Sequence, residues 1–133
     1  MEEQMKSGDI FYARTHAELL NQILGTDYKQ YMKCAYNLSD DTVIWMIRLD
    51  GHESKAGWTN ILRADGIYEV YTGDPCSRLD AHKTPNYPKK RLVFDIVESA
   101  YQGRRYIFRG IYKFDDMAGD NDRRVWRKIS DKY

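Results

Sequence analysis

The sequence predicts an α+β fold, a small, mostly antiparallel and partly closed β-barrel with one or two short helices. Three observations favour this class. One capping signal marks a single clear helix, six or seven short runs are rich in β-branched and aromatic residues, and turn residues separate most of these runs. So many short strands must stack as two sheets or curl toward a barrel, because both solutions bury apolar faces and limit free edges.

Length and composition indicate one globular domain. The chain has 133 residues, of which 42% are hydrophobic and 31% charged, which is too apolar for a disordered protein. We expect a flexible tail over residues 1–7 and a single compact domain over residues 8–133. No apolar run approaches the roughly 18 residues of a membrane span. The polar start and the two cysteines predict a cytoplasmic, reducing location without a secretory signal, a disulfide scaffold or a membrane.

The first half of the chain is predicted to hold two strands and one secure helix. Residues 10–13 form the first strand. Thr15 and Glu18 then fit a capping box, in which each side chain satisfies the other's backbone amide, and Gly25 ends the helix over residues 16–24. Residues 28–36 suit a second helix or a strand equally well. Residues 42–49 predict a central strand that turns at Asp50-Gly51 into a polar loop over 52–57.

The second half is predicted as two hairpins and a closing strand. Strands over 58–63 and 67–72 flank the turn Ala64-Asp65-Gly66, and a long connection over 73–90 follows. Strands over 91–101 and 104–114 form the second hairpin, and an acidic loop over 115–122 leads to the strand over 123–130. Alternation places Tyr106, Phe108, Gly110, Tyr112 and Phe114 on one side of their strand, which we assign to the core.

Charge divides unevenly along the chain. Residues 1–82 carry 8 Lys/Arg and 13 Asp/Glu, whereas residues 83–133 carry 13 and 7. A basic half predicts a polyanionic partner, unless the two halves neutralise each other in the fold. If the strands over 104–114 and 123–130 pair, their cations form one patch, which Asp95 and Glu98 could compensate. The candidate nucleic-acid-binding residues are Arg105, Arg109, Lys113, Arg124, Arg127 and Lys128.

Aromatic residues make up 14% of the chain, and most are tyrosines. Tyr and Trp rings stack on planar ligands, and an asparagine side chain offers both a donor and an acceptor to the edge of a base. A place in the hydrophobic core is the alternative for each ring. The candidate pocket residues are Trp45, Trp58, Asn60, Tyr68 and Tyr71.

No motif predicts catalysis, a metal site or a cofactor. The chain has neither a nucleophile elbow nor a glycine-rich phosphate loop. The triplet Glu53-Ser54-Lys55, with Asp40, Asp41 or Asp50 as a further acid, has the composition of a metal-dependent nuclease site but follows a turn instead of lying on a strand. We therefore expect no catalytic residues and no bound metal or cofactor.

Residues 104–114 and 125–130 resemble the last strands of a PUA-like barrel, the superfamily that includes the SRA domains, which flip modified cytosines out of DNA. The shared pattern is an aromatic-x-aromatic-x-Gly-x-aromatic strand, an acidic loop and a short basic strand. The resemblance implies a pocket that captures one base, with basic residues that grip the nucleic-acid backbone on either side of that base. We therefore expect a non-catalytic module that binds nucleic acid, DNA rather than RNA, or a nucleotide. The alternatives are a protein-interaction or inhibitor module from a phage or defence system, and then a metal-dependent nuclease.

Overall fold

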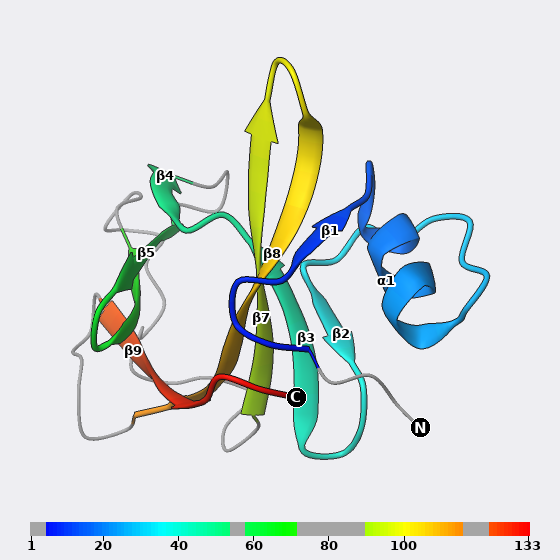
Figure 1. The fold of residues 1–133 in the computed structure, drawn as a ribbon. Coiled ribbons are helices and arrows are strands. Elements are labelled where there is room, and N and C mark those ends of the chain that lie inside the picture. Colours follow the sequence, from blue (N-terminus) through cyan, green and yellow to red (C-terminus); the bar gives the residue numbers. More distant parts are fainter. Residues whose placement is uncertain (1–4, 54–57, 72–89, 116–122) are drawn as a thin grey trace.

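The computed structural model describes residues 5–53, 58–71, 90–115 and 123–133. Within these residues nine strands form one mixed sheet in the order β2-β3-β7-β8-β9-β6-β5-β4, and β1 pairs with β8 (Figure 1). The elements are β1 (Ile10–Tyr12), α1 (His16–Leu24), β2 (Ala35–Asn37), β3 (Thr42–Ile47), β4 (Asp50–Glu53), β5 (Trp58–Arg63), β6 (Gly66–Tyr71), β7 (Lys90–Ser99), β8 (Gly103–Phe114) and β9 (Arg123–Ser130). The pair β3–β7 is parallel and the other described pairs are antiparallel.

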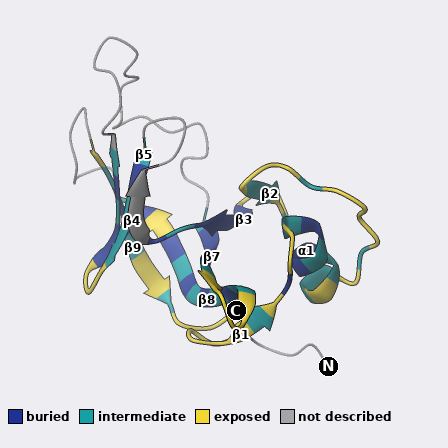
Figure 2. Cartoon of the chain, turned by 90° about the horizontal axis from the view of Figure 1, so that it is seen from above, coloured by how far each residue is buried: buried dark blue, intermediate teal, exposed yellow. Residues whose placement is uncertain are grey.

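The mostly β architecture with a short helix agrees with the prediction, but the partly closed barrel is not confirmed. The end strands β2 and β4 do not pair with each other in the described part of the chain, so the sheet is open. Figure 2 shows α1 and β2 on one side of β7 and β8, and β4, β5 and β9 on the other. No helix among the described residues is long and apolar enough to cross a membrane.

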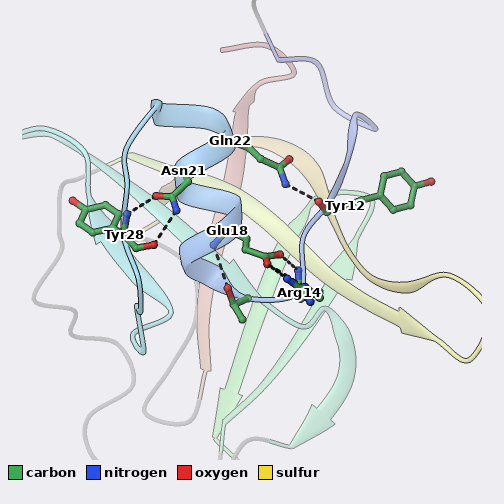
Figure 3. A network of polar contacts seen from close by, with 7 residues as sticks. Tyr12, Arg14, Glu18, Asn21, Gln22 and Tyr28 are labelled. Atoms are coloured by element: carbon green, nitrogen blue, oxygen red, sulfur yellow. Dashed lines mark hydrogen bonds and ion pairs between the residues drawn. The ribbon is translucent and has the colours of Figure 1, made fainter.

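The helix α1 begins and ends where the sequence predicts, although its cap differs in detail. The hydroxyl of Thr15 accepts a hydrogen bond from the Glu18 amide at 3.2 Å, as a capping box requires. The Glu18 carboxylate, however, accepts from the amide of Arg14 at 2.7 Å and from its guanidinium, not from the amide of Thr15 (Figure 3). Gly25 ends the helix in the left-handed conformation, with φ of 69°.

Of the two alternatives for residues 28–36, the helix is absent, and the end of this segment belongs to the strand β2. The side-chain amide of Asn21 donates to the Tyr28 carbonyl, and its oxygen accepts from the Tyr28 amide (Figure 3). These two bonds hold the backbone that follows α1 without a helical turn. The residues at the end of this segment then pair with β3 as the edge strand β2.

The sheet has two hydrophobic cores, one on each face. Leu19 and Leu20 of α1 pack with Phe94, Tyr106 and Phe108 in the first core. The second core lies on the opposite face and contains Trp45, Ile47, Leu49, Ile67, Val93, Tyr112, Phe114 and Trp126. The sequence predicted one aromatic core face for β8. All of these side chains are buried, but they divide between two cores.

A β-bulge causes this division. Phe108 pairs with Phe94 while Gly110 pairs with the preceding residue Val93, so Arg109 is an extra residue that moves the next side chains to the other face. Gly110 has φ of 123°, and a Cβ there would lie 2.7 Å from the backbone oxygen of Ser130. Only glycine fits this position without strain.

Three further differences concern turns and ends. The predicted Asp50-Gly51 turn is wrong, because both residues lie in β4, which pairs with β5. Residues 5–7, predicted as tail, pair with the C-terminal residues, since the amides of Met5 and Ser7 donate to the carbonyls of Tyr133 and Asp131. The β5–β6 hairpin forms as predicted. The predicted loops over 52–57, 73–90 and 115–122 lie mostly outside the described residues.

Candidate nucleic-acid interface

Polar side chains gather on the face of the sheet that carries the Trp45–Trp126 core, which we call the inner face. The pairing register aligns Asn60 of β5, Glu69 of β6 and Arg124 of β9 in one row across three strands. Residues paired in this way point to the same side of a sheet. This polar row lies next to the row that contains Trp126, so it borders the second core on the same face.

Glu69 is the centre of this polar row. It is only 9% exposed, and its Oε1 accepts hydrogen bonds from Nε1 of Trp126 at 3.3 Å and from Nη1 of Arg124 at 3.4 Å. The guanidinium of Arg124 also lies 4.6 Å from the centre of the Trp58 ring. One buried carboxylate is thus linked to a core indole on one side and, through an arginine, to a half-buried indole on the other.

Arg91 is a buried cation in the same region. It is 5% exposed, and its guanidinium lies 4.4 Å from the Trp45 ring centre and 4.0 Å from that of Trp126. Burial lowers the pKa of Arg91 to about 10, and the charge of Glu69 opposes this shift. A buried arginine that contacts two packed indoles is costly to retain, and such buried charges cluster at functional sites.

Two buried polar atoms of this region have no hydrogen-bond partner among the described residues: Oδ1 of Asn60 and Nε of Arg91. A buried donor or acceptor left unpaired costs about 1–3 kcal/mol. An acceptor and a donor of this kind, both near the same carboxylate, are therefore typical of a site that binds a polar ligand.

The structure brings some predicted pocket residues together and separates others. Trp58 and Asn60 lie half-buried on the inner face. Trp45 is 3% exposed and packs on Trp126 with ring centres 5.4 Å apart, so it belongs to the core. Tyr68 points to the opposite face of the sheet, which we call the outer face, and its hydroxyl donates to Asp65 there at 2.8 Å. Tyr71 pairs with Trp58, but its side chain lies outside what the structure describes.

Sequence reasoning named Trp126 among the rings that could line a pocket, but it missed two residues of this region, Glu69 and Arg91. The strand alternation contained a usable signal for Glu69, because it lies two residues after Ile67, a core residue, and therefore on the same face. Arg91 follows Lys90 at the start of β7, and no local pattern shows that its charge is buried.

The predicted pairing of the two basic strands is confirmed, but their cations lie on both faces. Register places Arg105, Arg124 and Lys128 on the inner face, and the guanidinium of Arg109 reaches Asp95 there; Lys113 and Arg127 lie on the outer face. Four of the six have acidic partners: Arg109 pairs with Asp95 at 2.8 Å, Arg124 with Glu69, Arg127 with Asp65 and Asp115, and Lys128 with Asp131. Arg105 and Lys113 have no acidic partner among the described residues.

The predicted neutralisation between the two halves of the chain is therefore present in part. Ion pairs between the halves join Arg124 to Glu69, Arg127 to Asp65, Arg48 to Glu98 and Lys90 to Asp41. Asp95 compensates a cation of β8 as the alternative interpretation proposed, whereas Glu98 pairs with Arg48 and Arg104.

The predicted nuclease triplet gains no support from the fold. Glu53 is the last residue of β4, and Ser54 and Lys55 lie outside the described residues. Where the structure describes side chains, no group of three or more His, Cys, Asp or Glu residues could hold a metal ion.

Comparison with known proteins gives a family and a structural relative. The model of the SRA family, the SET and RING associated domain, matches residues 2–133. No curated protein matches the chain. Among solved structures, "The 5-Hydroxymethylcytosine-Specific Restriction Enzyme AbaSI" is 26% identical, with a TM-score of 0.73 over 98% of this chain and 42% of that chain. The present chain thus spans less than half the length of AbaSI.

These findings confirm the resemblance drawn from the last strands and extend it to nearly the whole sequence. SRA domains are PUA-like modules that bind DNA, which supports the prediction of a nucleic-acid-binding module. The match over residues 2–133 establishes that the chain belongs to the SRA domain family.

Proposed function

We propose that this domain binds DNA containing a modified cytosine and holds the flipped base on the inner face, beside Trp58, Asn60 and Glu69. The observation that carries the proposal is the unpartnered, buried Oδ1 of Asn60, which lies directly opposite Glu69 in an SRA fold. The name of AbaSI, which is specific for 5-hydroxymethylcytosine, supports a modified cytosine as the ligand class.

The chemistry of a flipped cytosine matches these side chains. An extruded base needs an aromatic or apolar surface to stack on and hydrogen bonds to its edge. Trp58 supplies a half-buried indole. The Asn60 oxygen and the Glu69 carboxylate can accept from the exocyclic amine or from a hydroxyl substituent, and Nε of Arg91 can donate to a ring acceptor. The pocket therefore offers acceptors and a donor together.

Phosphate contacts would come from the cations of the inner face. Arg105 is the first candidate, because no described acidic side chain pairs with it. Further phosphate contacts would come from Arg109, Arg124 and Lys128 where DNA binding replaces their ion pairs with acidic side chains. Such contacts position the DNA without reading its sequence.

The proposal concerns binding, with no catalytic step. Restriction activity belongs to the whole AbaSI chain, which is more than twice the length covered here. We propose DNA in preference to RNA and a cytoplasmic location. The comparisons do not favour the alternative of a protein-interaction module.

Fluorescence anisotropy with matched duplexes tests this function. The duplexes differ only in one cytosine, which is unmodified, methylated or hydroxymethylated. We expect the wild-type protein to prefer one modified duplex. Asn60→Ala should weaken binding of that duplex by about tenfold, which is the cost of losing roughly one buried hydrogen bond. The affinity for the unmodified duplex should stay unchanged.

Glu69→Gln and Asn37→Ala complete the set. Glu69→Gln keeps an oxygen that can accept from Trp126, so the contact with the core is preserved. Because the negative charge is lost, this variant should also reduce the preference for the modified duplex. Asn37 is an exposed asparagine of β2 and serves as the matched control. Equal affinity of the wild-type protein for all three duplexes, or a preference that survives Asn60→Ala, would contradict the proposal.

A further inference from the structure

A groove of about 580 Å³ lies on the face of β5 and β6 opposite to the inner face. It is lined by Arg63, Ala64, Asp65, Tyr68, Val70 and Arg123. Tyr68 alternates with Glu69 along β6, so the two side chains point to opposite faces of the same strand. The groove is therefore separate from the candidate base pocket.

Two guanidinium groups contact Tyr68, the one aromatic residue among the described residues that line this groove. The guanidinium of Arg63 lies 5.3 Å from the centre of the Tyr68 ring, and that of Arg123 lies 5.8 Å away. Both arginines are exposed residues, so their planar donors can reach a ligand. Stacking on a tyrosine restricts the long side chains and keeps both forks near the same volume.

The carboxylate in the groove, Asp65, is bonded to Tyr68 and Arg127. Oδ2 of Asp65 accepts from the Tyr68 hydroxyl at 2.8 Å and from Nη1 of Arg127 at 3.0 Å. Arg63 has no acidic partner among the described residues, and Asp65, the described carboxylate that lines the groove, is bonded to Arg127. Arg63 thus brings a positive charge to the groove that no described carboxylate offsets.

The outer face continues this charge away from the groove. Arg127 lies on the same side of β9 as Arg123, and it pairs directly with Lys113 of β8, which in turn pairs with Lys90 of β7. Like charges directly opposite each other are unfavourable. Asp115 and Asp41 compensate Arg127 and Lys90, respectively, and Lys113 has no described acidic partner. A row of cations therefore leads into the groove.

We propose that this outer groove is a second anion site, which binds a phosphate group through Arg63 and Arg123. Guanidinium forks match phosphate oxygens bidentately, and the volume of the groove admits a phosphate with an attached sugar or base. The phosphate can belong to a free nucleotide or to the backbone of a nucleic acid. The site is independent of the proposed base pocket, and neither function requires the other.

Titrations followed by NMR test the site in the full chain. The probes are inorganic phosphate, deoxycytidine monophosphate and an unmodified oligothymidine, none of which carries a modified cytosine in a duplex. We expect saturable shifts of the Arg63 side-chain resonance and of the amides of residues 63–70. Tighter binding of the mononucleotide than of phosphate supports a nucleotide, whereas tighter binding of the oligonucleotide alone supports the backbone of a nucleic acid.

Variants connect the shifts to the groove. Arg63→Ala should weaken binding of the preferred probe by about tenfold, and Arg63→Lys should give an intermediate value because it keeps the charge without the fork. Arg14→Ala removes another exposed arginine, beside α1, and should leave these affinities unchanged. Asn60→Ala should also leave these affinities unchanged, which separates this site from the base pocket. Unchanged affinities in Arg63→Ala, or shifts confined to the inner face, would overturn the proposal.

Discussion

The guanidinium of Arg91 lies 4.0 Å from the centre of the Trp126 ring, in the most buried part of the inner face. The Trp45 ring, which packs beside that of Trp126, also contacts the guanidinium, with its centre 4.4 Å away. The only described carboxylate with a marked electrostatic effect on Arg91 is Glu69, which is itself held by Trp126. Three strands that are distant in sequence thus fix one buried charge beside the candidate base pocket.

Replacement of Arg91 by methionine should separate binding from stability. Methionine can fill the space against the two indoles and brings no charge that must be buried. We expect the free energy of unfolding to stay within about 1 kcal/mol of the wild-type value or to exceed it. The preference for modified DNA should decrease, because the Nε donor is lost. Urea unfolding and fluorescence anisotropy measure the two effects.

The lysine variant is the control for this experiment. Arg91→Lys keeps a positive charge but loses the planar guanidinium that contacts both rings, so both stability and binding should fall. If Arg91→Met instead lost several kcal/mol of stability and kept the full preference for modified DNA, Arg91 would have a purely structural role.

The long strands could be predicted from sequence, because their pattern is local. Residues 91–101 and 104–114 alternate clearly around a Gln-Gly turn, and the structure confirms that hairpin. The short strand β2 was left open between helix and strand, and β4 was missed, because three or four residues show no alternation. They form because β3 and β5 offer free edges, and this information is not local.

The candidate site was predictable only where residue type was sufficient. Trp58 and Asn60 were selected because their side chains suit a base, and both lie on the inner face. Tyr68 was selected for the same reason, yet strand alternation turns it to the outer face. Glu69 and Arg91 were missed because a charged residue in a strand is usually exposed, and their burial depends on contacts with Trp126 from another part of the chain.

The bulge in β8 predicts a specific cost for Gly110→Ala. A Cβ at this position would combine an unfavourable positive φ with a contact of 2.7 Å to the backbone oxygen of Ser130. We expect a loss of about 1–3 kcal/mol in the free energy of unfolding from backbone strain, increased by the steric contact. Gly103→Ala is the matched control, since Gly103 also has a positive φ, but a Cβ there would meet no described atom within 4 Å. Equal losses in the two variants would show that the contact with Ser130 relaxes without cost.

The histidine of α1 predicts a pH dependence of stability. Nδ1 of His16 lies 2.6 Å from the hydroxyl of Tyr106, and burial, assisted by the charge of Arg104, lowers the pKa of His16 below 6.5. Between the folded-state pKa and 6.5 the unfolded chain therefore binds more protons than the folded one. Stability should be greatest above pH 6.5 and should decrease as the pH falls through this range.

His16→Gln provides the comparison, because glutamine does not titrate. The difference in unfolding free energy between the wild-type protein and this variant, measured in urea on both sides of pH 6.5, should change with pH in the stated direction. A constant difference would mean that the environment of His16 does not favour its neutral form.

Two arginines of β8 predict different effects on the salt dependence of DNA binding. Arg105 has no described acidic partner, whereas Arg109 is bonded to Asp95 at 2.8 Å, and Asp95 also accepts from the amide of Leu49. A phosphate contact releases counterions only where the cation is not already neutralised. Arg105→Ala should therefore weaken binding of modified and unmodified duplexes alike. It should also reduce the slope of log affinity against log salt concentration by about one. Arg109→Ala should change the slope less, and identical slopes in both variants and the wild-type protein would place this half of β8 away from the DNA.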